Sequence, residues 1–277
     1  MTSTFTLRGS NILGKTLTIH SYKGGTGKTS IAANLAASYA KNGSDVCILD
    51  YDFRAPSMQV LFKGKPKNYL NDFLDEKCDI SDVLIDVTRK NKTKGKLLVG
   101  LTGHSTKTMR EIMTKDRKWE MKALHLTLSA KATLYKDLNV DYIIFDTSPG
   151  MHYSSINAIA ASDFALLVTK LDEFDFEGTK ELINGIYDVL GRKTGILLNK
   201  IPTMHVPIGD GQKKLEEKLG RSFNFPIFGM IPCYCDVQAD GGKTIYTLQK
   251  PNHPFSQSIE QLTEKLEDYL GKLDSSE

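Results

Sequence analysis

The stretch Lys23-Gly24-Gly25-Thr26-Gly27-Lys28-Thr29 decides how the rest of this sequence is interpreted. It follows a strand-like run at 16–21 and leads into an alanine-rich helix that begins near Ser30. In such a setting glycines let backbone N–H groups turn inward around polyphosphate, Lys28 reaches the β- and γ-phosphates, and the Thr29 hydroxyl ligates Mg²⁺. The sequence therefore predicts a nucleoside triphosphate site. Its expected contacts come from Gly24, Gly25, Thr26, Gly27, Lys28, Thr29 and Ser30; the alternative is a glycine turn without a ligand.

Two further strand-like runs end in carboxylates. The run at 45–50 ends at Asp50, with Asp52 two residues later, and the run at 141–146 ends at Asp146, shortly before Pro149-Gly150. Buried parallel strands deliver such acids to the carboxyl edge of a sheet. We expect Asp146 to hold Mg²⁺ through water and the Gly150 N–H to lie near the γ-phosphate. For Asp50 and Asp52, capping of the following turn is the alternative.

The strand-like run at 194–199 bears on the identity of the base. It continues as Asn199-Lys200-Ile201-Pro202. A guanine-reading loop has the pattern Asn-Lys-x-Asp, and here proline stands where its aspartate would accept from guanine. The sequence therefore favours ATP.

Lys23 is a second lysine that an ordinary phosphate loop does not require. With it, the loop resembles the deviant Walker A motif of the ParA/MinD superfamily, and the motifs follow that family's order over roughly residues 16–270. The resemblance implies that Lys23 crosses a dimer interface to the partner's phosphates, that Asp52 orients the attacking water and that Asp50 lies near Mg²⁺ or holds the loop. It also implies that Asn199 hydrogen-bonds adenine and that Pro232 belongs to a second segment beside the base. For Asn199, capping of a turn is the alternative.

The fold expected is α/β: a mainly parallel sheet with helices on both faces, the three-layer sandwich of P-loop NTPases. Seven strand-like runs alternate with helical stretches, and 40% of the 277 residues are apolar. We expect a polar N-terminal extension at 1–14 and one ATPase domain at 15–277. No signal-peptide pattern and no run of 18 apolar residues is present. The protein is therefore expected in the cytoplasm, with nucleoid or membrane association in its ATP state. The predicted strands lie at 16–21, 45–50, 97–101, 141–146, 163–169, 194–199 and 226–231.

Four cysteines are too few and too scattered for a disulfide scaffold, so reduced thiols are expected. Cys233 and Cys235 are the exception, because two thiolates this close suit a metal or iron–sulfur site. An alternative function is therefore a cluster-carrying ATPase. The other possibility for this pair is packing near the base.

The net charge is only +3, but the segment 88–122 holds eleven basic and three acidic residues. Such a surplus attracts polyanions, so we expect DNA or an acidic partner there, with membrane less favoured. A solvated face explains the surplus equally well. Trp119, the only tryptophan, is either a contact residue or an anchor for a helix.

Three further segments carry structural expectations. From 255 to 277 an apolar stripe at helical spacing lies beside six acids and two lysines, so we expect a helix packed on the domain rather than on an anionic bilayer. Residues 69–74 and 80–87 are expected to form short helices. In the acidic loop 172–175, Glu173 and Asp175 are candidates to meet a partner, although acids at a helix N-terminus need no such reason.

The patterns predict an ATPase, and the resemblance implies that it is slow, dimerises on binding ATP and Mg²⁺, is stimulated by an activator protein, and positions or partitions DNA, division or motility machinery. A small-molecule kinase or ligase sharing the loop is a second alternative, but nothing in the sequence indicates an acceptor pocket.

Overall fold

The computed structural model describes residues 14–202 and 210–274. Its centre is an eight-stranded sheet with the order β3-β4-β2-β5-β1-β6-β7-β8, and every neighbouring pair is parallel except β3 and β4. The strands are β1 Lys15–His20, β2 Val46–Tyr51, β3 Leu84–Asp86, β4 Leu97–Gly100, β5 Tyr142–Thr147, β6 Phe164–Thr169, β7 Lys193–Ile201 and β8 Ile227–Pro232.

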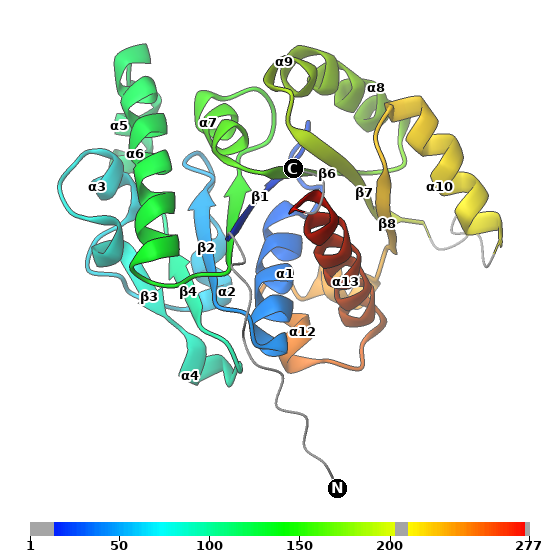
Figure 1. Ribbon diagram of the computed structural model, residues 1–277, viewed down its shortest axis with the longest axis horizontal. Helices are drawn as coiled ribbons and strands as arrows, with labels where there is room; N and C mark the ends of the chain where they lie inside the picture. The colour runs from blue at the N-terminus through cyan, green and yellow to red at the C-terminus, as the bar shows by residue number, and fades with distance from the viewer. Residues whose placement is uncertain (1–13, 203–209, 275–277) are drawn as a thin grey trace, which may run out of the picture.

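Helices cover both faces of this sheet (Figure 1). The larger ones are α1 Lys28–Asn42, α5 Thr106–Met113, α6 Arg117–Lys136, α7 Tyr153–Ala161, α8 Glu173–Leu182, α10 Asp210–Phe223 and α13 Pro254–Asp274. The shorter ones are α2 Met58–Phe62, α3 Leu70–Leu74, η1 Ile80–Val83, α4 Thr88–Asn91, η2 Ile183–Tyr187, α9 Asp188–Leu190, α11 Cys235–Ala239 and α12 Tyr246–Gln249. The α/β architecture expected from the sequence is confirmed.

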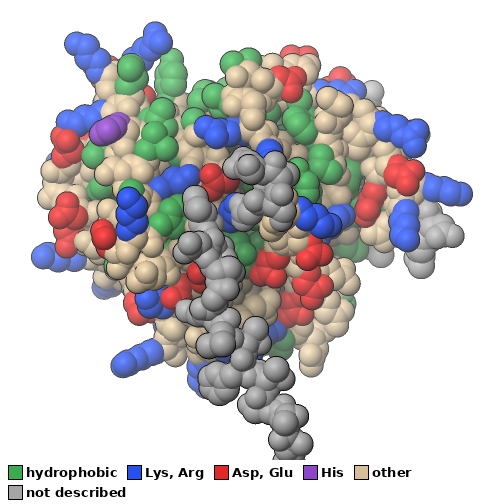
Figure 2. All heavy atoms as spheres, in the orientation of Figure 1, with side chains coloured by type: hydrophobic (Ala, Val, Ile, Leu, Met, Phe, Trp, Pro, Cys, Tyr) green, Lys and Arg blue, Asp and Glu red, His purple; other side chains and the backbone are tan. Residues whose placement is uncertain are grey.

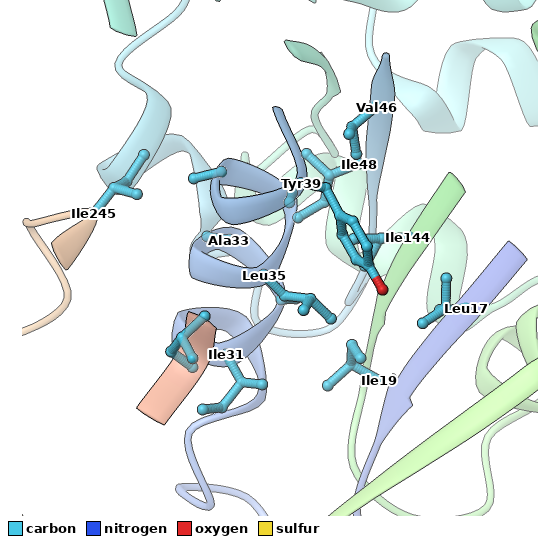
Figure 3. Packing of buried hydrophobic residues seen from close by; sticks show 14 of the residues in the cluster. Leu17, Ile19, Ile31, Ala33, Leu35, Tyr39, Val46, Ile48, Ile144 and Ile245 are labelled. Carbon is cyan, nitrogen blue, oxygen red and sulfur yellow. The ribbon is translucent and has the colours of Figure 1, made fainter. Parts of the chain in front are cut away.

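Alanine-rich α1 packs closely on one face of the sheet because its small side chains allow a near approach. Ile31, Leu35 and Tyr39 of α1 lie against the strands (Figure 3), and all three are fully buried. The Tyr39 ring also stacks on Tyr142 of β5, with 4.1 Å between ring centroids. This packing fixes the start of α1, and with it the phosphate loop, at the carboxyl edge of the sheet.

Helix α13 lies over α1, as the apolar stripe predicts. Ile259, Leu262, Leu266 and Leu270 are at most 2% exposed, and the Thr263 hydroxyl donates to Ser38 of α1 over 3.0 Å. Within residues 14–202 and 210–274, no helix is both long and apolar enough to cross a membrane.

One prediction is wrong in its second half. Residues 80–87 were expected to form a short helix, but only η1 is helical and the next three residues form edge strand β3. Ile85 explains the change: it pairs with Val99 of β4, and it lies under the loop at Gly64, where a Cβ would come within 2.5 Å of its side chain. The short helix predicted at 69–74 is present as α3. The domain boundaries stay a prediction, because residues 1–13 lie outside the described part of the chain.

Candidate functional site

The phosphate loop joins β1 to α1 with the backbone geometry that its glycines predict. Gly25 and Gly27 have positive φ angles of 75° and 96°. A Cβ at Gly27 would come within 2.5 Å of the Asn199 amide nitrogen, so only glycine fits there. Gly27 is also the residue that precedes the first turn of α1, and this places the helix N-terminus at the loop.

Lys28 is buried inside this loop. Its ammonium donates to the Ser21 hydroxyl over 2.9 Å, and that hydroxyl donates to the Lys23 carbonyl over 2.6 Å. Burial lowers the pKa of Lys28, while the charges of Asp146 and Asp52 oppose this effect. The loop therefore holds a cation in place before any phosphate arrives. Ser21 was not predicted from the sequence, because nothing in the motif marks it.

Three predicted acids meet beside Lys28. Asp50 of β2 and Asp146 of β5 are neighbours in the sheet register, and each is only 1% exposed. Neither carboxylate oxygen of Asp146 has a hydrogen-bond partner among the described residues. Burial raises the pKa of Asp146 to about 7, with Thr29 and Lys28 opposing the rise, and the pKa of Asp50 is raised by burial and by the charges of Asp146 and Asp52.

Asp146 suits a divalent cation, because a buried carboxylate without a hydrogen-bond partner gains most from a bound positive charge. Asp50 lies beside it and already accepts from the Asp52 N–H over 3.1 Å. The described residues contain no group of three or more His, Cys, Asp or Glu arranged to hold a metal. Mg²⁺ does not require such a group, since it commonly binds one or two carboxylates, substrate phosphates and several waters. Thr29, Asp50 and Asp146 therefore fit the predicted Mg²⁺ site.

Asp52 caps the turn after β2, as the capping alternative predicts, and it also contacts Ser148 in the turn after β5. Its Oδ1 accepts from the Ala55 N–H over 3.0 Å, the Arg54 N–H over 3.2 Å and the Ser148 hydroxyl over 2.7 Å. The turn after β2 is thus tied to the turn after β5. Water activation by Asp52 stays a prediction.

Gly150 has a φ of 76°, and its N–H donates to the Ser21 carbonyl over 2.9 Å. The predicted contact of this N–H with a γ-phosphate therefore requires the bond to Ser21 to break. Segment 148–150 is linked to the phosphate loop through Ser21 and to β2 through Asp52.

The end of β7 holds the phosphate loop from the other side. Asn199 donates to the Thr26 carbonyl over 2.8 Å, and Lys200 donates to the Gly25 carbonyl over 2.9 Å. Next to them is a cavity of about 290 Å³. Its lining includes the predicted Ser30, Asn199 and Pro232, as well as Tyr234 and Gln238, which the sequence analysis missed. The Asn199 amide that was expected to bind adenine is thus used, in this structure, to support the loop.

Cys233 and Cys235 lie at this cavity's end of β8, where base contacts were expected. The Gln238 amide donates to the Cys233 sulfur over 2.7 Å, and Cys235 is exposed. Neither belongs to a larger group of metal-binding side chains in the described residues. The geometry therefore favours the packing alternative for Cys233.

Lys23 sits at the mouth of the loop, and its side chain is 42% exposed. Its ammonium lies 3.7 Å from a carboxylate oxygen of Asp175 in α8 of the same chain. Asp175 was a candidate to meet a partner, but it is only 1% exposed. The Asp172 side chain caps α8 by accepting from the Asp175 N–H over 2.9 Å.

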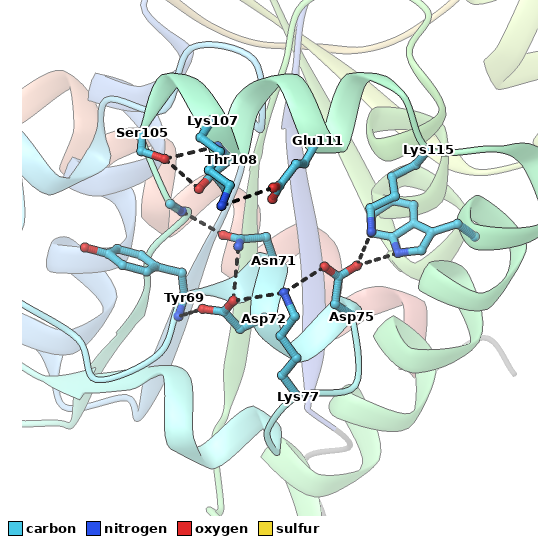
Figure 4. A network of polar contacts seen from close by, with 12 residues as sticks. Tyr69, Asn71, Asp72, Asp75, Lys77, Ser105, Lys107, Thr108, Glu111 and Lys115 are labelled. Atoms are coloured by element: carbon cyan, nitrogen blue, oxygen red, sulfur yellow. Dashed lines mark hydrogen bonds and ion pairs between the residues drawn. The ribbon is translucent and has the colours of Figure 1, made fainter.

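The fold divides the basic segment 88–122 between two places. Arg89, Lys90, Lys92, Lys94 and Lys96 lie on α4 and the turn that precedes β4, whereas α5 and α6 project from the other end of the sheet (Figure 1). On α6 and its approach, Lys115 pairs with Asp75 over 2.6 Å and Lys122 pairs with Glu76. Asp75, which Figure 4 shows paired with Lys115, also accepts from the Trp119 indole N–H over 2.8 Å, so Trp119 is an anchor.

Lysines from a distant part of the sequence add to the positive charge around α4. Lys90 donates to the Lys63 carbonyl over 3.3 Å, which brings the loop 63–67 beside α4. Lys and Arg side chains are visible along this lower left part of the molecule (Figure 2). We call this the basic surface, and it consists of Lys63, Lys65, Lys67, Arg89, Lys90, Lys92, Lys94 and Lys96.

The chain is similar to known proteins in sequence and in fold. A family model described as AAA domain matches residues 14–198, more than half of the chain. The septum site-determining protein MinD of Thermotoga maritima is 24% identical over 262 residues, which cover 92% of this chain and 88% of that protein.

Two solved structures share the fold. The septum site-determining protein MinD of Pyrococcus horikoshii, complexed with Mg-ADP, has a TM-score of 0.73 and 19% identity, covering 94% of this chain and 98% of its own. A putative plasmid partition protein of Borrelia burgdorferi, bound to AMPPNP, has a TM-score of 0.72 and 21% identity. The match covers 92% of this chain and 99% of that one. The chain belongs to the AAA domain family of that model, and it is a P-loop ATPase of the ParA/MinD family.

Proposed function

We propose that this ATPase works as a switch in which ATP joins two copies face to face and hydrolysis separates them. The observation that carries the proposal is the exposure of Lys23: Lys28 is buried in the loop, whereas the side chain of this second loop lysine is 42% exposed. An ammonium so placed is suited to reach the phosphates of a second copy.

The surface around Lys23 supports this proposal. Tyr22, Met151 and Tyr153 are 38%, 60% and 58% exposed, which is high for such large apolar side chains. Tyr22 and Met151 also border α8 and η2: a Cβ at Gly178 would touch the Tyr22 ring, and one at Gly185 would lie 3.8 Å from the Met151 sulfur. An apolar rim around a charged site is typical of a surface that becomes covered.

Each predicted residue has a role in this proposal. Lys28 and the loop N–H groups would bind the phosphates, and Asp52 would orient the attacking water. Thr29, Asp50 and Asp146 would hold Mg²⁺, which neutralises phosphate charge. Gly150 and Asp52 are both hydrogen-bonded to neighbouring segments. Loss of the γ-phosphate would therefore move these segments and change the surface that contacts the second copy. We expect turnover to be slow until an activator protein binds.

The output of the cycle would be ATP-gated binding of a cargo or surface inside the cytoplasm. The basic surface is our candidate for a polyanion such as DNA or an acidic partner, and nucleoid or membrane association would then follow the ATP state. Partition, or positioning of division or motility machinery, is the class of role that fits such a cycle.

Light scattering with ADP and with ATP tests the switch, using Asp52→Ala to slow hydrolysis. We expect a monomer with ADP and a dimer with ATP. Lys23→Ala is the matched control: it should keep ATP binding, measured by fluorescence of a labelled nucleotide, and lose the dimer. A chain that binds and turns over ATP as a monomer would contradict the switch and direct attention to a phosphoryl acceptor.

A further inference from the structure

Two aromatic side chains are buried near the phosphate loop with polar atoms that have no partner. His20 is the last residue of β1, Tyr187 is the last residue of η2, and both are at most 1% exposed. Their ring centroids lie 6.3 Å apart. Neither His20 Nε2 nor the Tyr187 hydroxyl has a hydrogen-bond partner among the described residues. Because a buried polar atom without a partner is costly, two of them so close together require a physical explanation.

The hydrogen bonds of His20 show which kind of partner Nε2 lacks. The Thr147 hydroxyl donates to the Ile19 carbonyl over 2.9 Å, so its single proton is already used. It therefore accepts from His20 Nδ1, which lies 2.7 Å away. Burial lowers the pKa of His20 to about 3, and the charges of Lys28 and His152 act in the same direction, so the ring is neutral at physiological pH. The one ring proton is then on Nδ1, and Nε2 is an acceptor without a donor.

The His20 ring also lies beside segment 148–150, which is predicted to meet the γ-phosphate. Thr147, its hydrogen-bond partner, directly precedes this segment. Backbone groups at both ends of the segment oppose the lowering of the His20 pKa, so they lie close to the ring. The Gly150 N–H donates to the carbonyl of Ser21, the residue that follows His20. When Gly150 breaks this bond to reach a γ-phosphate, the surroundings of the His20 ring therefore change.

Tyr187 is connected to the same segment through η2. Met151 directly follows Gly150, and a Cβ at Gly185 in η2 would lie 3.8 Å from the Met151 sulfur. The element η2 is a single turn of π-helix, Ile183–Tyr187, between α8 and α9. Such turns contain one residue more than an α-helical turn and often occur at functional sites. Displacement of Met151 therefore acts on the turn that carries Tyr187.

We propose that Tyr187 is a positioning residue for segment 148–150 and acts through His20: when a γ-phosphate is bound, the Tyr187 hydroxyl donates to His20 Nε2. The donor and the acceptor are complementary and both are already buried, so the bond forms without further desolvation. It stabilises the ATP position of the segment and is absent with ADP. The inference rests on one part of the proposed function, the contact of the Gly150 N–H with a γ-phosphate.

Binding of AMPPNP and of ADP to the Lys23→Ala chain tests this proposal, because that chain is expected to bind nucleotide without dimerising. Tyr187→Phe removes one oxygen atom from a buried ring. It should weaken AMPPNP binding about fivefold, the effect of one neutral buried hydrogen bond, and leave ADP binding unchanged. Competition with a fluorescent nucleotide measures both dissociation constants. A ligand can favour one position of the segment only through such a difference in affinity.

Tyr39→Phe is the matched control. The Tyr39 hydroxyl is also buried without a hydrogen-bond partner among the described residues, but its ring stacks on Tyr142 under α1. This control should change neither dissociation constant. A double-mutant cycle identifies the acceptor: His20→Asn keeps a nitrogen donor near the position of Nδ1 and removes Nε2. It should weaken AMPPNP binding by itself, and Tyr187→Phe added to it should have no further effect.

Nuclear magnetic resonance of ¹⁵N in the imidazole ring gives a readout that a merely structural role would not change. With ADP, His20 Nε2 should have the chemical shift of an acceptor without a hydrogen bond. With AMPPNP the signal should move towards that of a hydrogen-bonded acceptor, and Tyr187→Phe should abolish this movement. A signal that does not move, or that shows the proton on Nε2, overturns the proposal.

The outcomes separate this inference from the ATP-dependent dimer. If the Asp52→Ala chain forms no dimer with ATP but Tyr187→Phe weakens only AMPPNP binding, the dimer switch fails and the role of Tyr187 is supported. If Tyr187→Phe weakens both nucleotides equally, weakens neither, or still acts in the His20→Asn chain, the role of Tyr187 is overturned. Should Tyr187→Phe fail to fold, a His20→Asn chain with unchanged AMPPNP binding overturns it equally.

Discussion

Asp146 gives a pH-dependent prediction at the scale of one residue. Because the pKa of its carboxyl is raised in the folded protein to about 7, the folded state binds a proton more readily than the unfolded chain between about pH 4 and pH 7. The stability that this group contributes is therefore highest at the acidic end and falls as the pH rises to 7. Without Mg²⁺ and nucleotide, Asp146→Asn should raise the free energy of unfolding at pH 8 by on the order of 2 kcal/mol.

Urea unfolding at pH 5 and pH 8 measures this effect. The gain of the variant should shrink towards pH 5, where the wild-type carboxyl is protonated in the folded state. Asp137→Asn, which changes an exposed carboxylate, is the control and should show no such pH-dependent gain. A variant that is less stable than wild type at pH 8 would contradict the account, and it would indicate that Asp146 supports Lys28 more than burial penalises it.

Which site residues the sequence could predict depends on the distance over which they act. Lys28, Thr29 and Asp146 are recognisable because a strand, a short loop and a helix follow one another in the chain. Asp175 is different. Its contact with Lys23 joins segments about 150 residues apart, and its burial follows from the packing of α8 beside the loop. No local pattern carries that information.

The same limit of local sequence patterns applies to helices and strands. The seven strands of the parallel core were predictable because continuous apolar runs alternate with helical stretches. Strand β3 was not, because three residues form it only by pairing with β4 at the sheet edge. Likewise, the two ends of segment 88–122 read as one basic stretch in sequence, but β4 lies between them and carries them to opposite ends of the sheet.

Helix α13 gives the prediction that belongs to this scale. Leu266 is fully buried between α13 and the rest of the core, so Leu266→Ala should lower the free energy of unfolding by about 2–4 kcal/mol. Glu264→Gln changes an exposed position of the same helix and should have little effect. Urea unfolding with ADP is the measurement. A loss below about 0.5 kcal/mol would mean that α13 is loosely attached, contrary to the packing seen against α1.

At the scale of the whole molecule, the phosphate loop and the basic surface lie at opposite ends of the sheet. The phosphate loop lies where the parallel strands end, whereas α4 and its turn lead into the start of β4. A polyanion on the basic surface therefore leaves the face around Lys23 open to a second copy. Two copies joined at that face would each present a basic surface, and the paired surfaces would bind one long polyanion more tightly than either does alone.

Replacing Lys65, Lys67, Lys92 and Lys94 with Gln tests this arrangement. All four are exposed, and no ion pair involves them in the described residues. Binding of a labelled DNA duplex by the ATP-loaded Asp52→Ala protein should weaken, and the slope of log affinity against log salt should become shallower by about 3–4 per chain, because each lost phosphate contact contributes about 0.9. Fluorescence anisotropy at several salt concentrations measures both. The matched control replaces Lys107, Arg110, Arg117 and Lys118 on α5 and α6. If that control loses the binding instead, the polyanion surface lies at the α5–α6 end, and if neither variant changes it, DNA is not the partner of the basic surface.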